Sequence, residues 1–207
     1  MSREQKCILY INMDYQTKTK LMVPFRGTWM VSNGGRTVET NNHVRFAEGD
    51  GPKNQIFAYD FRRGHTGDGN KLEDYDVFGE EVIAPGDGVI IQVIDGAIDV
   101  LPGERDRAVG CGNTVIIDHQ NGEFSVLCHF KYQSIRVGVG DAVKQGDILG
   151  LCGNSGNTSE PHIHFHLQDG PRMHTAGALP AQFLCIIVNG EMKTKYEPMR
   201  KQMVSNV

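Results

Sequence analysis

Residues Glu160–Leu167 read Glu-Pro-His-Ile-His-Phe-His-Leu, so histidine and apolar side chains alternate along this stretch. Successive side chains of a β-strand point to opposite faces, and the order therefore predicts a strand with imidazoles on one face and an apolar stripe on the other. The histidines are His162, His164 and His166. On a strand they would stand about 6 to 7 Å apart. The apolar stripe predicts that the opposite face packs into the core of a sheet.

Short β-branched runs separated by turn residues begin at Val82 and repeat at roughly the 8 to 12 residue spacing that is typical of all-β domains. The runs are Val82–Ala84, Gly88–Ile94, Thr114–Asp118, Phe124–His129, Ile148–Cys152 and His162–Leu167. Glycine and asparagine between the runs tolerate positive φ and predict tight turns. Residues Gly96–Gly110 are charged and contain glycine, which indicates a surface loop that could border a site. We find no convincing long helix, and the pattern predicts an all-β fold.

The chain has 207 residues, which fits a single domain. We place its core at about residues 36–190 and expect the flanks, 1–35 and 191–207, to be peripheral. Strand-like pieces at Cys7–Asn12 and Leu21–Phe25 are expected to add to the same sheet system. The last residues are rich in charge and methionine, which favours a frayed end.

The composition excludes several classes of protein. Hydrophobic residues make up 39% and charged residues 22% of the chain, as in an ordinary globular domain. A net charge of -4 gives no basic field for a phosphate backbone, so we expect no nucleic-acid partner. No apolar run is long enough for a transmembrane segment, and the first 20 residues lack the order of a signal peptide. Either a signal has been removed or the protein stays inside the cell.

The five cysteines are odd in number and widely spaced, with no C-x-x-C pair among them. They are Cys7, Cys111, Cys128, Cys152 and Cys185. This spacing argues against a zinc site built from thiolates. Cys128 and Cys152 sit in apolar runs, where a free cysteine behaves as a small buried hydrophobe.

Two further ionisable residues lie in strand-like runs. His129 closes the run Phe124–His129, and strand ends are often where sites are built. Asp60 lies in the run Phe57–Phe61, where a buried carboxylate is costly unless it is paired or bound to a metal. A metal or a neighbouring arginine, Arg62 or Arg63, is the expected partner.

Five segments together resemble the lysostaphin-like zinc metallopeptidases, the LytM-type endopeptidases of the bacterial cell wall. They are Val82–Gly88, Gly112–His119, Leu127–Phe130, Val137–Gly150 and Gly153–Phe165. In order and spacing the resemblance covers about residues 54–184. It implies that His164 binds zinc, that His162 contacts the substrate and the reacting oxygen, and that His129 is the general base.

The same resemblance implies that Asp60 and an earlier histidine complete the zinc site. Many members keep these two ligands four residues apart, whereas Ile56 occupies that position here. A subgroup keeps its histidine further upstream, after asparagine, and His43 fits that place. His65 is the rival, although its surroundings do not reproduce the family spacing. His166 occupies a position that is often acidic or amide, which implies a supporting role.

The fold implied by the resemblance is a twisted antiparallel sheet with a smaller covering sheet and a groove above the histidine face. The stretch Val139–Gly150 is similar to the hybrid sandwich of lipoyl-type domains, a motif that the family is described as duplicating.

The activity implied is zinc-dependent hydrolysis of peptide bonds in bacterial peptidoglycan by a metal-activated water, outside the cytoplasm. Family members cut glycyl bonds or bonds next to D-residues, and both remain open here. One alternative is a degenerate module that binds or regulates at the cell wall without catalysis, which a missing metal ligand would indicate. Another is a phosphocarrier of related fold, which would not need Asp60 or His43.

Overall fold

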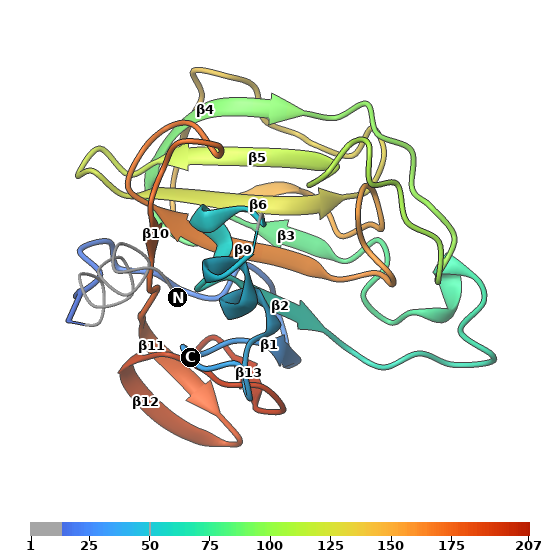
Figure 1. Ribbon diagram of the computed structural model, residues 1–207, viewed down its shortest axis with the longest axis horizontal. Helices are drawn as coiled ribbons and strands as arrows, with labels where there is room; N and C mark the ends of the chain where they lie inside the picture. The colour runs from blue at the N-terminus through green and yellow to red at the C-terminus, as the bar shows by residue number, and fades with distance from the viewer. Residues whose placement is uncertain (1–13, 50) are drawn as a thin grey trace.

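The computed structural model describes residues 14–49 and 51–207, so the strand-like piece expected at Cys7–Asn12 lies outside the described residues. One large antiparallel sheet dominates the described part (Figure 1). Across the sheet, the strands are β12 (Glu191–Tyr196), β11 (Phe183–Val188), β13 (Met203–Ser205), β1 (Trp29–Asn33), β2 (Tyr59–Arg62), β9 (Ile163–Gln168), β6 (Phe124–Phe130), β5 (Asn113–Asp118), β4 (Gly88–Ile94) and β7 (Ala142–Val143). The short strand β10 (Ala178–Leu179) pairs with β9.

A second, smaller sheet consists of β3 (Glu81–Ile83) and β8 (Ile148–Leu151). Three short 3-10 helices complete the regular structure: η1 (Asn42–Ala47), η2 (Lys53–Gln55) and η3 (Leu72–Asp74). The predicted all-β class, with a large antiparallel sheet and a smaller one, is confirmed. None of the helices in the described ranges has the length and apolar character needed to cross a bilayer.

Strand β9 has the two faces that its alternating sequence predicts. It lies between β2 and β6, so both edges are paired. Ile163, Phe165 and Leu167 are fully buried in the main hydrophobic core. The histidines lie on the other face, toward the functional groove described below.

The smaller sheet covers the apolar face of the large sheet, on the side of Phe165. Val82 from β3 and Leu149 from β8 belong to the same buried cluster as Phe165. Their apolar side chains require this placement, because exposing them would forfeit the free energy of their burial. The expected groove above the histidine face is present, but no residue of β3 or β8 lines it. It is bordered by connecting segments, which corrects the predicted role of the smaller sheet.

The described parts of the two flanks, residues 14–35 and 191–207, include segments that are not peripheral as expected. Strand β1 lies inside the sheet between β13 and β2, and it pairs Trp29 with Val204 of β13. Both side chains are fully buried. β1 and β13 are short strands from opposite ends of the chain that pair with each other. Sequence periodicity reports only on neighbouring residues, so it could not predict this pairing.

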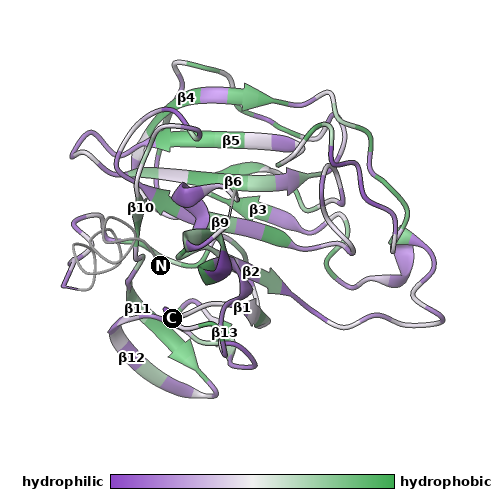
Figure 2. Ribbon diagram, in the orientation of Figure 1, coloured by the Kyte–Doolittle hydropathy of each residue, from purple (hydrophilic) through white to green (hydrophobic). Residues whose placement is uncertain are grey.

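The remaining flanking segments behave differently from one another. Leu21 and Phe25 are buried and form isolated bridges to Phe183 and Val82, so the run Leu21–Phe25 is extended without being a regular strand. Strand β12 is the outer strand of the sheet, and Figure 2 shows it as mainly polar next to the apolar β11. Charged side chains on an edge strand discourage pairing with other chains.

Candidate functional site

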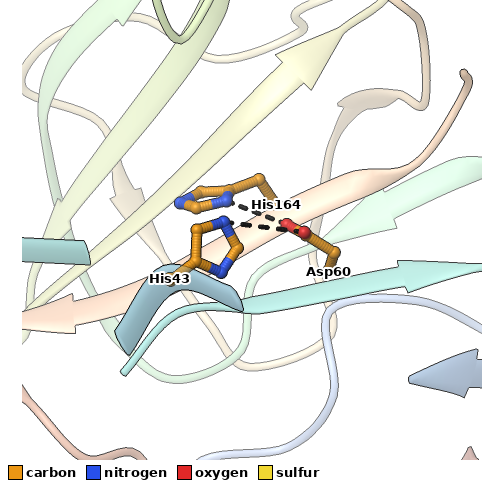
Figure 3. A group of neighbouring side chains, drawn as sticks. All are labelled: His43, Asp60 and His164. Atoms are coloured by element: carbon orange, nitrogen blue, oxygen red, sulfur yellow. Dashed lines mark hydrogen bonds and ion pairs between the residues drawn. The ribbon is translucent and has the colours of Figure 1, made fainter. Parts of the chain in front are cut away.

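A cluster of one carboxylate and two imidazoles lies where η1, β2 and β9 meet (Figure 3). His43, Asp60 and His164 each offer a ligand atom, and these atoms all lie within 4.8 Å of one another. Asp60 and His164 are direct register partners on β2 and β9, and the two strands therefore hold them side by side. His164 Nδ1 lies 2.9 Å from Asp60 Oδ1, and His43 Nε2 lies 3.6 Å from Asp60 Oδ2.

Asp60 is only 7% exposed, and its carboxylate is held by several side chains. Asn33 on β1 donates a hydrogen bond of 2.7 Å to Oδ2, in addition to the imidazole contacts. Burial alone would raise the pKa of Asp60, but the neighbouring His43 and His162 outweigh it and hold that pKa well below its usual range. The arginines considered as partners of Asp60 instead form ion pairs with other residues, Arg62 with Glu160 and Arg63 with Glu80.

His43 is positioned by the N-terminal cap of η1. The Asn41 Oδ1 atom accepts a hydrogen bond from the His43 backbone N–H at 3.0 Å and lies 3.0 Å from His43 Nδ1. This contact occupies Nδ1 and leaves Nε2 toward Asp60. Burial lowers the pKa of His43 to about 4, which keeps the imidazole neutral and able to bind a metal.

A chain of buried polar groups continues behind His164. Its Nε2 lies 3.1 Å from His166 Nδ1, and His166 Nε2 lies 3.0 Å from Asn54 Nδ2 and 3.2 Å from Gln168 Oε1. His166, Asn54 and Gln168 are each at most 2% exposed. Burial holds the pKa of His166 well below its ordinary value. The structure thus places His166 behind His164 and outside the cluster of ligand atoms.

His129 reaches the site from an irregular point of β6. Asn113 pairs with Phe130 and Thr114 with Cys128, so His129 is the extra residue of a β-bulge. Its φ of 68° lies in the left-handed region, which is strained for a non-glycine residue and typical of functional sites. Its Nδ1 lies 2.7 Å from the Ser155 carbonyl oxygen, which leaves Nε2 for the groove that the ring lines. Burial, together with the nearby His162 and His164, lowers its pKa well below the ordinary value.

His162 stands beside His129, with ring centroids 4.8 Å apart. Its Nδ1 lies 2.8 Å from the Glu160 carbonyl oxygen, and its Nε2 lies 3.5 Å from Asp60 Oδ1. Burial would lower the pKa of His162, but the charge of Asp60 outweighs it and the pKa is raised. His129 and His162 therefore each have Nδ1 next to a backbone carbonyl oxygen and Nε2 on the side of the site.

The rival ligand His65 lies outside the cluster. It is exposed, contacts Tyr75, and its Nδ1 lies 3.3 Å from the Thr66 carbonyl oxygen. His174 lines the groove from the loop after β9. His119 is buried at the turn after β5, where it contacts the Asp87 carbonyl oxygen and Ser125.

The cluster forms the floor of a groove with a volume of about 1110 Å³. Its borders come from four connecting segments, which lie between β1 and β2, between β4 and β5, between β8 and β9, and after β9. The loop Gly96–Gly110, predicted as a surface loop that could border a site, contributes Arg105, Ala108, Val109 and Gly110.

Several supporting residues escaped the sequence analysis. Asn41 could have been noticed as a cap residue two positions before His43. Gln168 continues the alternation of His162, His164 and His166 on the same strand face, so period two alone pointed to it. Asn33 and Asn54 gave no such signal, because their contacts with Asp60 and His166 join segments far apart in the chain.

Comparison with known proteins adds an independent line of evidence. Residues 70–175, about half of the chain, match the sequence pattern of the family described as Peptidase family M23. Over 62 residues the chain is 42% identical to Endolysin 2638A of Staphylococcus phage 2638A, covering 30% of this chain and 13% of that protein. Over 89 residues it is 32% identical to the peptidoglycan DD-endopeptidase ShyA of Vibrio cholerae, covering 43% of this chain and 17% of that protein.

Among solved structures, the catalytic domain of the prophage-encoded M23 protein EnpA from Enterococcus faecalis matches with a TM-score of 0.49 and 21% identity. The match covers 76% of this chain and 94% of that one. Against the curated relatives, in contrast, this chain spans a fifth or less of their length. The family pattern begins after His43 and Asp60 but includes His129, His162 and His164. On the extent of that match, the chain belongs to peptidase family M23.

Proposed function

We propose that this protein is a zinc-dependent endopeptidase that hydrolyses peptide bonds of bacterial peptidoglycan. The observation that carries the proposal is the convergence of His43, Asp60 and His164 on one point in the floor of a groove, with two further imidazoles beside it. Membership of a peptidase family supports the reaction class.

The donor set fits zinc. Two imidazole nitrogens and one carboxylate are common zinc ligands, and three protein ligands leave one coordination position open, as in catalytic zinc sites. The burial of Asp60 between imidazoles also fits, because a carboxylate so little exposed needs a cationic partner. When bound, zinc would supply a Lewis acid that polarises the scissile carbonyl and makes a water acidic near neutral pH.

His129 and His162 would carry the proton transfers. His129 Nε2 is the ring nitrogen left open by the contact of Nδ1 with Ser155, so we assign it as the base that takes a proton from the attacking water. His162, with Nδ1 held by Glu160, would donate a hydrogen bond from Nε2 to the carbonyl oxygen as negative charge develops there. We propose the same group as the donor of a proton to the leaving amine.

The substrate class follows from the relatives. ShyA is described as a peptidoglycan DD-endopeptidase, and the phage protein is described as an endolysin. We extend this substrate class to the present chain, which would act on a peptide of the cell wall and therefore outside the cytoplasm. His166 would support the site by holding the far nitrogen of His164, and Asn54 and Gln168 would in turn hold His166.

Metal analysis of matched variants tests the ligand assignment. The purified protein is expected to hold about one zinc per chain, and His43→Ala should lose it while His65→Ala retains it. Zinc loss from His65→Ala with retention by His43→Ala would overturn the choice of ligand.

Release of soluble fragments from purified peptidoglycan tests the activity. The zinc-loaded protein should clear a peptidoglycan suspension, and His129→Gln should abolish clearance without changing the zinc content. If the zinc-loaded protein binds peptidoglycan but releases nothing, the catalytically degenerate binding module is the correct reading instead.

A further inference from the structure

The groove above the histidine cluster carries more basic than acidic side chains. Arg45 of η1 and Arg105 of the loop after β4 both line it, and His174 lines it too. Asp60 is the sole carboxylate among the described residues that line the groove. The negative charge of Asp60 is already paired with the imidazoles of His43 and His164 in the floor of the groove. The walls therefore offer positive charge without a competing acid.

The excess of basic over acidic side chains is a local feature of the groove. The whole chain has a net charge of -4, so a basic surface is not its general property. Glu104 and Asp106 flank Arg105 in sequence, yet neither lines the groove. The Asp106 carboxylate accepts a hydrogen bond of 3.0 Å from the backbone N–H of Ala108. Of these three residues, only Arg105 therefore contributes charge to the groove.

The two guanidinium groups are available to a ligand. Arg45 and Arg105 are both exposed, and neither forms any of the ion pairs recorded within residues 14–49 and 51–207. Glu39 exerts a weaker electrostatic influence on Arg45 from outside the groove. A guanidinium binds a carboxylate through two parallel hydrogen bonds, which makes arginine the residue best suited to select a carboxylate.

We infer that the peptide cut by this enzyme carries a free carboxylate on the part that lies along the groove, where Arg45 and Arg105 bind it, and that a neutral glycyl bridge is a poor substrate. The inference rests on the proposed endopeptidase function and names the substrate class of the same site. The carboxylate would stand on the stretch of peptide that occupies the groove, since both arginines border the groove whose floor holds His129 and His162.

Three synthetic peptides test this with the zinc-loaded protein. The first is a cross-linked stem peptide with free carboxylates, the second is the same peptide with those groups amidated, and the third is pentaglycine. The free acid should be cleaved with a kcat/KM about tenfold above that of the amide, as charge-assisted hydrogen bonds imply. Pentaglycine should be cleaved most slowly.

Variants assign the preference to the two arginines. The double variant Arg45→Gln with Arg105→Gln should raise KM for the free acid and leave KM for the amide unchanged, so that their ratio approaches one. Arg107→Gln is the matched control, because Arg107 is exposed on the same loop but does not line the groove. It should keep the wild-type ratio.

Equal cleavage of acid and amide by the wild type, or faster cleavage of pentaglycine, would overturn the substrate inference and leave the endopeptidase function standing. The same holds if the double variant keeps the full preference. If none of the three peptides is cleaved by folded, zinc-loaded protein, the proposed function itself fails, and the substrate inference fails with it.

Discussion

At the scale of single residues, His166 illustrates how a buried neighbour can define a metal ligand. His164 has Nδ1 toward Asp60 and Nε2 toward His166, so the second contact fixes which nitrogen faces the proposed metal. Replacing His166 by Phe removes that contact and keeps a ring of similar size. We expect zinc affinity to fall by about tenfold or more, the range typical of lost supporting contacts to ligating histidines.

The measurement is a competition titration with a chromophoric chelator. His65→Ala serves as the control, because His65 is an exposed imidazole outside the cluster. Unchanged affinity of a folded His166→Phe variant would show that His164 needs no such support.

Cys111 is expected to be the most reactive thiol of the described chain. It lines the groove and packs against Cys128. A hydrogen bond from the Cys128 thiol lowers the pKa of Cys111, and Gln55 Nε2 donates a further bond at 3.3 Å. Burial raises the pKa of Cys128, which therefore remains the protonated partner.

We expect iodoacetamide to label Cys111 before Cys185 at pH 7, although Cys185 is the more exposed. Mass spectrometry of the modified peptides measures the order. Cys128→Ala should slow the labelling of Cys111, since it removes the hydrogen-bond donor. Earlier labelling of Cys185 would contradict the electrostatic account of this pair.

At the scale of elements, the strands with regular alternation were predictable and the irregular ones were not. β4 and β9 follow from period two and from the turn residues that bound them. β11 is an apolar run as well, but its place in the sheet depends on β13, which pairs with both β11 and β1. β12 is rich in charged residues and β13 has only three residues, and only their pairing with β11 and β1 explains why they are ordered strands.

The candidate site divides in the same way. His162 and His164 share a strand face, so the sequence pattern alone brings them together. His129 reaches the site only through the β-bulge and its positive φ, and no pattern of residues in the sequence predicts either feature. His43 was placed through family resemblance, because a short 3-10 helix carries no periodic signal. The proposed site is therefore predictable where it follows a strand and unpredictable where it depends on long-range contacts.

The cap of η1 offers a test at the same scale. Asn41 is fully buried, and its Nδ2 donates to the carbonyl oxygens of Gly35 and Ala58, each at 2.9 Å. Asn41→Ala would leave both acceptors without this donor and would release His43. We expect a loss of about 1 to 3 kcal/mol in the free energy of unfolding, together with weaker zinc binding.

Urea denaturation of the metal-free protein measures the first effect and chelator competition the second. Asn42→Ala is the control, because Asn42 is exposed and its hydrogen bond to Asn33 Oδ1 uses the backbone N–H, which the substitution keeps. If both variants lose stability equally, the cap does not have the assigned role.

At the scale of the whole molecule, the chain ends are tied to the body that carries the site. Arg200, just before β13, donates to the Asn33 Oδ1 atom at 2.6 Å, and Asn33 in turn donates to Asp60. The C-terminal segment thus reaches the cluster through a single intermediate side chain. A site that looks local to β9 in sequence is supported by residues from both ends of the described chain.

Glu123 provides the corresponding link for the N-terminal segment. It is fully buried at the turn between β5 and β6 and accepts hydrogen bonds from Tyr15 Oη and from the backbone N–H groups of Lys18 and Thr19. Burial would raise the pKa of Glu123, but these donors outweigh it and lower the pKa below the ordinary value of 4.5. The ionised carboxylate is therefore the form that fixes the segment to the sheet.

The sign of the pH dependence follows from this lowered pKa. Above pH 4.5, the unfolded state is ionised as well, and the full stabilisation is present. As pH falls through the lower, folded-state pKa, the carboxylate is protonated and the stabilisation is lost.

Glu123→Gln should lower Tm at pH 7 by about 4 to 8 °C, which corresponds to about 2 kcal/mol for a chain of this size. The difference from wild type should shrink on acidification below pH 4.5. Calorimetry at pH 7 and pH 3.5 measures both values, and Glu191→Gln on the exposed strand β12 is the control. A Tm difference that stays constant between the two pH values would mean that packing of the side chain, and not its charge, holds the N-terminal segment in place.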